Sequence, residues 1–366
     1  MRDLSKVKSV IIKIGSSSLC DDEGNINKEK ILNLIWQIAQ IKRRGIKITL
    51  VSSGAINAGV HIMNLTERPQ TIPEKQALAA IGQASLMQIY EDLFSLFDLK
   101  CAQILLNHDD FDDRKRLMNF NHAMQALIKY DVVPIINEND TLASLIVPAV
   151  DADMVVLVSD IDGLYDDNPH LNKDAKLIRD VNGITSEIKK MAKDASSKVG
   201  TGGMVTKLKA AKVCNDYGCA MAIVNGSKEN VLVDLLNGED VGTYFNGDVG
   251  RKLSSREHWI MYRSMSKGKI IIDDGAKKAL VNNHSSLLPK GIIDVRGEFL
   301  IFQIVDIVDK DDALLARGMV NYSSDEIKLI KGLNTSEIEN RLNYKDYDEI
   351  IHANNLVLVE GVKNND

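Results

Sequence analysis

The stretch "SVIIKIGSSSLCDDEGNINKEKILNLIWQIAQIKRRGIKITLVSSG", residues 9–54, alternates between two kinds of apolar pattern. Residues 9–15 form a β-branched run that ends in glycine. Residues 28–45 place apolar side chains at helical spacing and end in a basic turn with Gly45. Residues 46–54 return to a β-branched run. Two strands joined by a helix of this length predict a parallel pair with a covered face.

The same alternation continues to about residue 250. Further strand-like runs stand at 101–107, 132–137, 154–160 and 219–226, and helix-like runs at 75–97, at 113–130 and after Met204. Strands separated by long helices indicate an α/β fold, a three-layer α/β/α sandwich with a mostly parallel sheet.

The pattern changes in the last hundred residues. Short β-like runs separated by turns stand at 267–273, 291–297, 299–307, 314–323 and 355–360. Runs of this kind are typical of a small β-rich domain. We therefore expect a first domain at 1–255, a polar linker at 256–266 and a β-rich domain at 267–366.

The composition excludes several classes of protein. The 366 residues include 45 Lys and Arg against 51 Asp and Glu, a net charge of −6, so no general basic field favours nucleic acid or an anionic membrane. The four cysteines form no CxxC pair and the histidines form no HExxH motif, so neither a disulfide framework nor a protein metal site is expected. No apolar run approaches the ~20 residues of a membrane span. These features predict a cytoplasmic protein that does not bind membranes.

Polar turns follow the first two predicted strands. Lys13 precedes Gly15 and three serines, a turn that could hold an anion with backbone N–H groups and one ammonium. The alternative is a strand-edge lysine before an ordinary polar turn. Ser53 and Gly54 end the second strand, and either bind a carboxylate or cap the next helix through the serine. Because parallel strands end at one edge of a sheet, both turns should open there.

Two later strand ends are also polar. Asn137, Asn139 and Asp140 follow the run at 132–137 and could hold an ammonium group or orient lysines, or form only an Asx-rich turn. Ser159 and Asp160 end the run at 154–160, where a following Asp-Gly pair is by itself typical of a turn.

Residues 200–207, "GTGGMVTK", do not match the P-loop pattern GxxxxGK[ST]. They combine a glycine turn with a helix start that presents Thr206 and Lys207. Backbone N–H groups, a helix dipole and a lysine together suit a transferring phosphoryl group. A helix cap would explain one glycine, and this turn has three, so we favour a phosphate site over a cap.

Six segments in order carry a resemblance to a known family. They are "IIKIGSSSL", "VSSGAINAG", "QALAAIGQASLM", "PIINENDT", "VDADMVVLVSDIDGLY" and "GTGGMVTKLKAA". Together they resemble the amino acid kinase family, in its branch that acts on L-glutamate. The tail, with "SLLPKGIIDVRGEF", "ARGMVNYSSDEI" and "HANNLVL", is similar to the PUA module.

The resemblance implies an activity. ATP and L-glutamate would give γ-glutamyl phosphate and ADP, the first step of proline biosynthesis, with Mg²⁺ on the phosphates, inhibition by proline and a homo-oligomeric assembly. One alternative is a sibling kinase for another carboxylate, such as aspartate or N-acetylglutamate. Another is a catalytically inactive sensor or RNA-binding protein, which the presence of both Lys13 and Lys207 disfavours.

The resemblance also implies roles for individual residues. Lys13 would hold phosphates, Lys207 would stabilise the transferring phosphoryl group, and Asp140 would complete the catalytic set. The ATP-binding residues would be Lys13, Gly15, Ser159, Asp160, Thr201, Gly202, Gly203, Met204, Val205, Thr206 and Lys207. The substrate-binding residues would be Ser53, Gly54, Asn137, Asn139 and Asp140.

One region departs from the family pattern. "NENDT" runs directly into "LASLIVPAVDAD", where the family has a further loop and a second GDND-type motif. Either the protein has lost this loop, or the protein has it and the sequence as given leaves it out. We expect that the given sequence leaves it out. Asn139 and Asp140 could therefore correspond to either motif, gripping the substrate ammonium or orienting the lysines. Pro148 should kink the helix that follows.

The PUA-like tail does not have the charge of an RNA-binding domain. Residues 267–366 contain 13 basic and 17 acidic residues, and phosphate binding favours the opposite sign. We expect a structural or regulatory domain that does not bind RNA.

Overall fold

The computed structural model describes residues 2–21, 23–65, 69–106, 110, 114–137, 140–169, 171–194, 203–247, 253–263 and 265–359. The chain divides into two compact units, Met1–Lys252 and Leu253–Asp366. Each unit has its own sheet and its own buried apolar cluster. Within the described ranges, no helix is both long enough and apolar enough to cross a membrane.

The sheet of the first unit has the order β3-β4-β2-β1-β5-β7-β8-β6. Its strands are β1 (Ser9–Ile14), β2 (Lys47–Ser52), β3 (Cys101–Ile104), β4 (Val133–Asn137), β5 (Met154–Ser159), β6 (Asp180–Val181), β7 (Ala220–Asn225) and β8 (Thr243–Phe245). Neighbouring strands are parallel along the sheet from β3 through β4, β2, β1 and β5 to β7. Strand β8 pairs antiparallel with β7. The predicted mostly parallel sheet is therefore confirmed.

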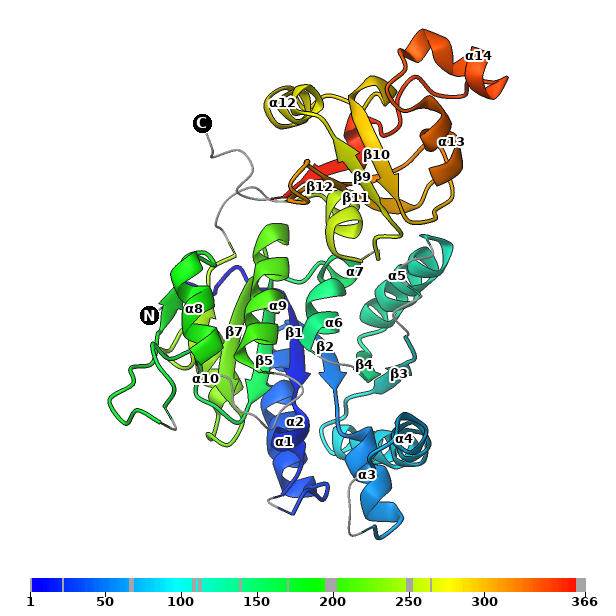
Figure 1. Ribbon diagram of the computed structural model, residues 1–366. Coiled ribbons are helices and arrows are strands. Elements are labelled where there is room, and N and C mark those ends of the chain that lie inside the picture. Colours follow the sequence, from blue (N-terminus) through cyan, green and yellow to red (C-terminus); the bar gives the residue numbers. More distant parts are fainter. Residues whose placement is uncertain are drawn as a thin grey trace. The chain divides into compact units, whose positions relative to one another are not determined.

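Helices cover both faces of this sheet. They are α1 (Ser16–Leu19), α2 (Lys28–Arg43), α3 (Ala55–Ile62), α4 (Ile72–Ser95), α5 (Arg114–Lys129), α6 (Asp140–Leu145), α7 (Val147–Val150), α8 (Ser186–Asp194), α9 (Met204–Tyr217) and α10 (Val231–Leu236). On one face α2, α4 and α10 pack in a common apolar cluster with the strands. On the other, α6 contacts β1 and β5, and α9 contacts β5 and β7. Figure 1 shows α6 and α9 alongside these strands.

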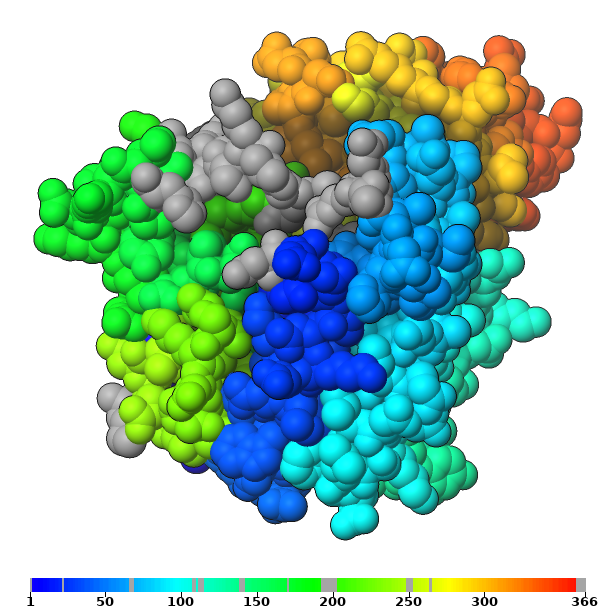
Figure 2. Space-filling view, turned by 90° about the horizontal axis from the view of Figure 1, so that it is seen from below, coloured from blue at the N-terminus to red at the C-terminus, as the bar shows by residue number. Residues whose placement is uncertain are grey.

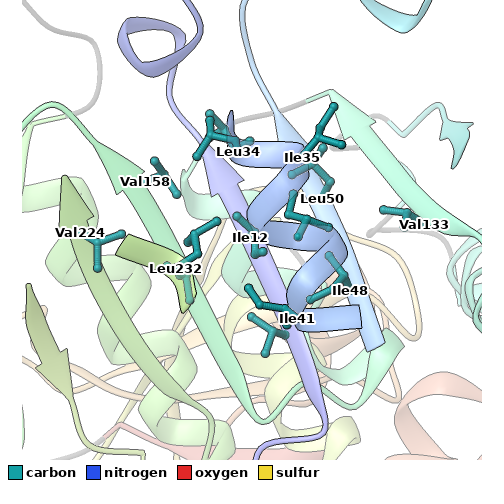
Figure 3. Packing of buried hydrophobic residues seen from close by; sticks show 14 of the residues in the cluster. Ile12, Leu34, Ile35, Ile41, Ile48, Leu50, Val133, Val158, Val224 and Leu232 are labelled. Carbon is teal, nitrogen blue, oxygen red and sulfur yellow. The ribbon is translucent and has the colours of Figure 1, made fainter. Parts of the chain in front are cut away.

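Local sequence explains why α2 forms and which side it buries. The side chain of Asn27 caps its start by accepting hydrogen bonds from the N–H groups of Glu29 and Lys30. Its apolar residues recur at helical spacing, and Leu34, Ile35 and Ile41 face Ile12 and Leu50 of the sheet in Figure 3. Burial of each such side chain contributes about 1.5–3 kcal/mol.

Helices α3 and α4 approach each other at two glycines. A Cβ on Gly82 would lie 1.9 Å from the carbonyl oxygen of Ala55, and one on Gly59 would lie 2.0 Å from that of Leu78. No side chain fits at these distances. The glycines of the segments "VSSGAINAG" and "QALAAIGQASLM" thus bring the backbone of α4 against the helix that follows β2.

The chain runs from β4 into α6, which begins at Asp140. The further loop that the family resemblance implies after Asp140 has no counterpart in the printed sequence, and its omission rather than deletion stays a prediction. The helix breaks at Ile146, and α7 starts with Pro148 in its first turn. The predicted kink is confirmed, because proline cannot donate the hydrogen bond that would continue α6.

The second unit has a five-stranded sheet in the order β10-β9-β11-β12-β13. Its strands are β9 (Lys269–Ile272), β10 (Ile292–Arg296), β11 (Ile304–Val308), β12 (Leu314–Met319) and β13 (Leu356–Leu358). Its helices are α11 (Ser255–His258), η2 (Trp259–Arg263), α12 (Asp274–Asn283), η3 (Pro289–Gly291), α13 (Ser324–Ile330), η4 (Thr335–Glu337), α14 (Ile338–Leu342) and η5 (Ala353–Asn355). The predicted β-rich character is confirmed.

Two details of this unit differ from simple sequence patterns. The predicted strand at 299–307 is wrong at its start, because residues 300–303 form a turn in which Phe302 has a φ of +64°. Within 256–266, α11 and η2 are helical, and Ile260 is buried with Ile304 and Val357.

Candidate active site

The candidate residues that the structure describes lie where the parallel strands end. The arrowhead of β2 points downward in Figure 1, and Figure 2 views the molecule from that side. There the dark-blue residues that follow β1 lie between the green part of the chain and the lighter-blue part around α3. Ligands of open parallel sheets bind beyond this edge of the strands.

Lys13 reaches this edge from within β1. Its neighbour Ile12 faces the cluster that contains α2, so Lys13 lies on the opposite face, where α6 contacts β1. A Cβ on Gly15 would lie only 3.8 Å from the Nζ of Lys13. The amine is therefore beside the turn that ends the strand, as the phosphate hypothesis requires.

Helix α9 begins at the same edge. It ends at Gly218, and β7 then starts level with the start of β5, where Ala220 pairs with Met154. Because a helix that precedes a parallel strand runs antiparallel to it, the N-terminus of α9 lies at the carboxyl edge. Gly203 is the N-cap, and the hydroxyl of Thr206 donates to its carbonyl oxygen at 2.7 Å.

Lys207 lies in the first turn of α9 and is 9% exposed. Helix α9 contacts α6, and α6 contacts β1, so Lys207 and Lys13 are on the same face of the sheet and at the same edge. A buried ammonium needs an anion or several acceptors to offset its lost hydration. The fold thus brings two lysines to one face and one edge of the sheet.

Among the described residues, nothing requires a glycine at position 203. Its φ is −71°, which any residue adopts, and a Cβ there would meet no atom of a described residue within 4 Å. Met204, next in the chain, is buried, whereas Val205 and Thr206 are partly exposed. No described residue fills the space beside Gly203, at the positive end of the helix dipole.

Ser159 and Asp160 end β5 as predicted. The hydroxyl of Ser159 is buried and donates to Oδ1 of Asp160 at 3.0 Å, and Asp160 is exposed. The N–H of Gly226, after β7, donates to the carbonyl oxygen of Ser159 at 2.8 Å.

An ion pair links the same two strand ends. Asp162 accepts hydrogen bonds from Asn225 Nδ2 at 2.8 Å and from Lys228 Nζ at 2.6 Å. Partial burial opposes ionisation, but these hydrogen bonds outweigh it and hold the pKa of Asp162 below its usual value. The turns after β5 and β7 are thereby tied together.

Ser53 does not cap α3. Its hydroxyl donates to the carbonyl oxygen of Ile14 at 2.8 Å and so ties the end of β2 to the end of β1. Gly54 is the N-cap, with no side-chain capping bond and a φ of +108° that favours glycine. The capping alternative for Ser53 is wrong.

The neighbouring Ser52 forms a buried 2.8 Å hydrogen bond with the hydroxyl of Tyr90 in α4. Burial raises the pKa of Tyr90 far above its usual value, so the phenol keeps its proton.

Asn137 ends β4 and is held from α4. Its Nδ2 donates to Oε1 of Gln83 at 2.6 Å. No role for Gln83 was predicted from sequence, although it lies within "QALAAIGQASLM". One feature of the sequence could have pointed to Gln83. It is a polar residue directly after Gly82, and the helix contains no charged residue from there to Tyr90.

Several predicted residues cannot be placed. Asn139, Thr201 and Gly202 lie outside the described residues, and so does the side chain of Asp140. The backbone of Asp140 starts α6 at the end of β4. Within the described ranges, no three His, Cys, Asp or Glu side chains gather in a way that could hold a metal ion.

Comparison with known proteins identifies the family to which this chain belongs. The model of the amino acid kinase family matches residues 8–225, and that of the PUA domain matches residues 268–342. A glutamate 5-kinase of Thermoanaerobacter sp. (strain X514) is 44% identical over 364 residues, covering 96% of this chain and 98% of the relative. Glutamate 5-kinases of Dictyoglomus thermophilum and Geobacter sulfurreducens are 43% and 42% identical, and cover 96% and 97% of this chain and 98% and 99% of their own. The chain belongs to the amino acid kinase family and carries a PUA domain.

Proposed function

We propose that this protein transfers the γ-phosphoryl group of ATP to the γ-carboxylate of L-glutamate, the first step of proline biosynthesis. The relatives that match nearly the whole chain carry the name of this activity. The structural observation that carries the proposal is that Lys13 and Lys207 lie on one face of the sheet at its carboxyl edge. No observation favours aspartate or N-acetylglutamate as the acceptor.

The chemistry needs little from the protein beyond placement and charge. A carboxylate oxygen of glutamate forms a bond to the γ-phosphorus, the bond from that phosphorus to the bridging oxygen breaks, and ADP leaves. No proton has to move, because the carboxylate is already ionised. Catalysis then depends on alignment and on stabilising negative charge on the phosphoryl oxygens.

We assign the ATP site to the turn after β1, the end of β5 and the start of α9. Lys13, Gly15 and Gly203 to Lys207 surround the phosphates, with Thr201 and Gly202, and Ser159 and Asp160 contact the nucleoside. Lys207 carries the largest catalytic effect, because a buried ammonium at a helix N-terminus stabilises a transferring phosphoryl group more strongly than a solvated one.

Mg²⁺ accompanies ATP in this proposal. It would be held mainly by phosphate oxygens and water, as magnesium usually is. When bound, the ion would neutralise charge on the β- and γ-phosphates.

The glutamate site lies at the ends of β2 and β4. Ser53, Gly54 and Asn137 would bind the substrate, together with Asn139 and Asp140. Proline shares the α-carboxylate and an ammonium group with glutamate, so we propose inhibition at this site. We also propose a homo-oligomer in the cytoplasm, and no role for RNA.

The proposal is tested by ATP consumption with L-glutamate and by trapping of the acyl phosphate with hydroxylamine. The expected result is a hydroxamate with L-glutamate and far less with aspartate or N-acetylglutamate. Absence of hydroxamate with every acidic amino acid would reject the kinase, and preference for another carboxylate would reject glutamate as the substrate.

A further inference from the structure

Two amide side chains from distant parts of the sequence form one pair at the edge of the sheet. Asn137 ends β4, and Gln83 lies in the middle of α4; Nδ2 of Asn137 donates to Oε1 of Gln83 at 2.6 Å. Both side chains are partly buried. A short amide–amide bond at a strand end fixes the orientation of both groups.

The turn of α4 that carries Gln83 also touches the segment after β2, where the proposed function places Ser53 and Gly54 beside the substrate. Gly82 lies against the backbone of Ala55, the first residue after Gly54, at a distance that leaves no room for a side chain. One helical turn therefore contacts both the segment that follows β2 and the residue that ends β4. Ser52 is joined to the same helix through Tyr90. Helix α4 is thus the common support of both strand ends.

The hydrogen bond determines what the pair can offer a ligand. An asparagine amide that donates through Nδ2 directs its Oδ1 away from the partner, where it can accept a hydrogen bond. Gln83 uses Oε1 as the acceptor, so its Nε2 keeps donors for a second group. An exchange of O and N in both amides would leave the same combination of one acceptor and one donor.

We infer that Gln83 is a positioning and specificity residue of the amino acid site, an inference that rests on the proposed function. It holds Asn137 so that Oδ1 accepts from the α-ammonium of the substrate, and its own Nε2 donates to a carboxylate. An acceptor beside a donor matches the zwitterionic end of a free amino acid. A substrate that lacks the ammonium leaves Oδ1 without a donor and binds more weakly.

Two variants test whether Gln83 serves the amino acid site. Gln83→Glu keeps an acceptor for Asn137 but replaces the donor by a negative charge that repels the substrate carboxylate. Gln83→Leu removes both that donor and the acceptor of the hydrogen bond that positions Asn137. We expect the KM for L-glutamate to rise at least tenfold in both variants, with the KM for ATP within twofold of wild type. Gln76→Glu, at an exposed position of the same helix, is the matched control and should behave as wild type.

A double-mutant cycle tests the positioning role. If Gln83 acts through Asn137, Gln83→Ala and Asn137→Ala should be strongly non-additive in kcat/KM for glutamate, since either change breaks the same pair. Thermal unfolding of each variant shows whether it is folded. A purely structural role would lower Tm and would change the parameters for ATP and glutamate together.

The outcomes distinguish this inference from the function on which it rests. Wild-type protein without glutamate-dependent ATP turnover would overturn both. Active wild-type protein, with a KM for glutamate in Gln83→Glu that stays within twofold of wild type, would overturn the role of Gln83 and leave the kinase intact.

Discussion

Gly203 stands at the start of α9, where neither its backbone angles nor any described neighbour excludes a side chain. Gly54 is different, because its φ of +108° favours glycine. We explain a glycine that no described neighbour requires by what binds beside it. In the proposed function this is the phosphate chain of ATP, close to Lys207.

Gly203→Ala should therefore separate binding from folding. We expect a Tm within about 1 °C of wild type, since the new methyl group meets no atom of a described residue, and a KM for ATP raised about tenfold or more. Steady-state kinetics and thermal unfolding measure the two effects. A variant with unchanged ATP kinetics would show that the phosphates do not approach this residue.

Lys207→Ala removes the buried amine of the first turn of α9. We expect kcat to fall at least hundredfold, which corresponds to about 2.7 kcal/mol of transition-state stabilisation, with the far-UV spectrum unchanged. Lys209→Ala is the matched control, because Lys209 is exposed on the same helix. If both variants turned over at the wild-type rate, another group would have to stabilise the phosphoryl transfer.

At the scale of elements, α4 is more than a cover for the sheet. Its second half packs Leu86, Tyr90 and Phe94 into the apolar cluster, and its first half carries Gly82 and Gln83 at the strand ends. Core packing and the candidate substrate site therefore depend on one rigid element, the arrangement that precise binding sites favour.

Gly82→Ala should loosen this arrangement. The added Cβ would lie 1.9 Å from a backbone oxygen of α3, which neither helix can avoid without moving. We expect the free energy of unfolding to fall by about 3 kcal/mol. Denaturant unfolding measures it. Gly203→Ala makes the same chemical change in open space, and equal stability of the two variants would contradict the close packing of α3 on α4.

The ion pair between the turns after β5 and β7 makes a pH-dependent contribution to the stability of the fold. Because hydrogen bonds from Lys228 and Asn225 lower the pKa of Asp162, its carboxylate stabilises the fold above its unfolded pKa near 4, and this stabilisation is lost as pH falls through the folded pKa.

Asp162→Asn should therefore be less stable than wild type at pH 7, with a difference that shrinks below about pH 4. Denaturant unfolding at several pH values tests this. A stability difference that stays constant down to pH 3 would assign the effect to packing rather than to charge.

At the scale of the whole molecule, every placed candidate site residue belongs to the unit Met1–Lys252. The unit Leu253–Asp366 has its own core, in which Ile307 and Tyr322 are fully buried. Damage to that core should therefore affect stability before catalysis.

Ile307→Ala should lower the free energy of unfolding of the second unit by about 2–5 kcal/mol. We expect kcat at 25 °C to be unchanged, because the proposed catalytic residues all belong to the first unit. Ile293→Ala, at a position of β10 that is 42% exposed, is the control and should change stability by no more than about 0.5 kcal/mol. A fall of kcat in Ile307→Ala alone would show that the second unit supports the active site.

The sequence by itself determined where most strands and helices of the first unit lie. Apolar periodicity predicted the strands β1, β2, β4, β5 and β7 and the helices α2, α4, α5 and α9, because each pattern reports which side of its own element is buried. It also predicted that Lys13 and Lys207 belong to polar strand and helix ends. The antiparallel strand β8 and the turn at 300–303 were missed, since three-residue strands and turns carry too little periodicity.

Only the tertiary structure decided which side chains meet. Periodicity does not reveal that the hydroxyl of Ser53 bonds to β1 rather than capping α3, or that Gln83 holds Asn137 across 54 residues of sequence. It does not place Lys13 and Lys207 on one face either. These contacts depend on the order of strands in the sheet and on how closely helices approach it. Both are set by the packing of distant segments, which no local pattern encodes.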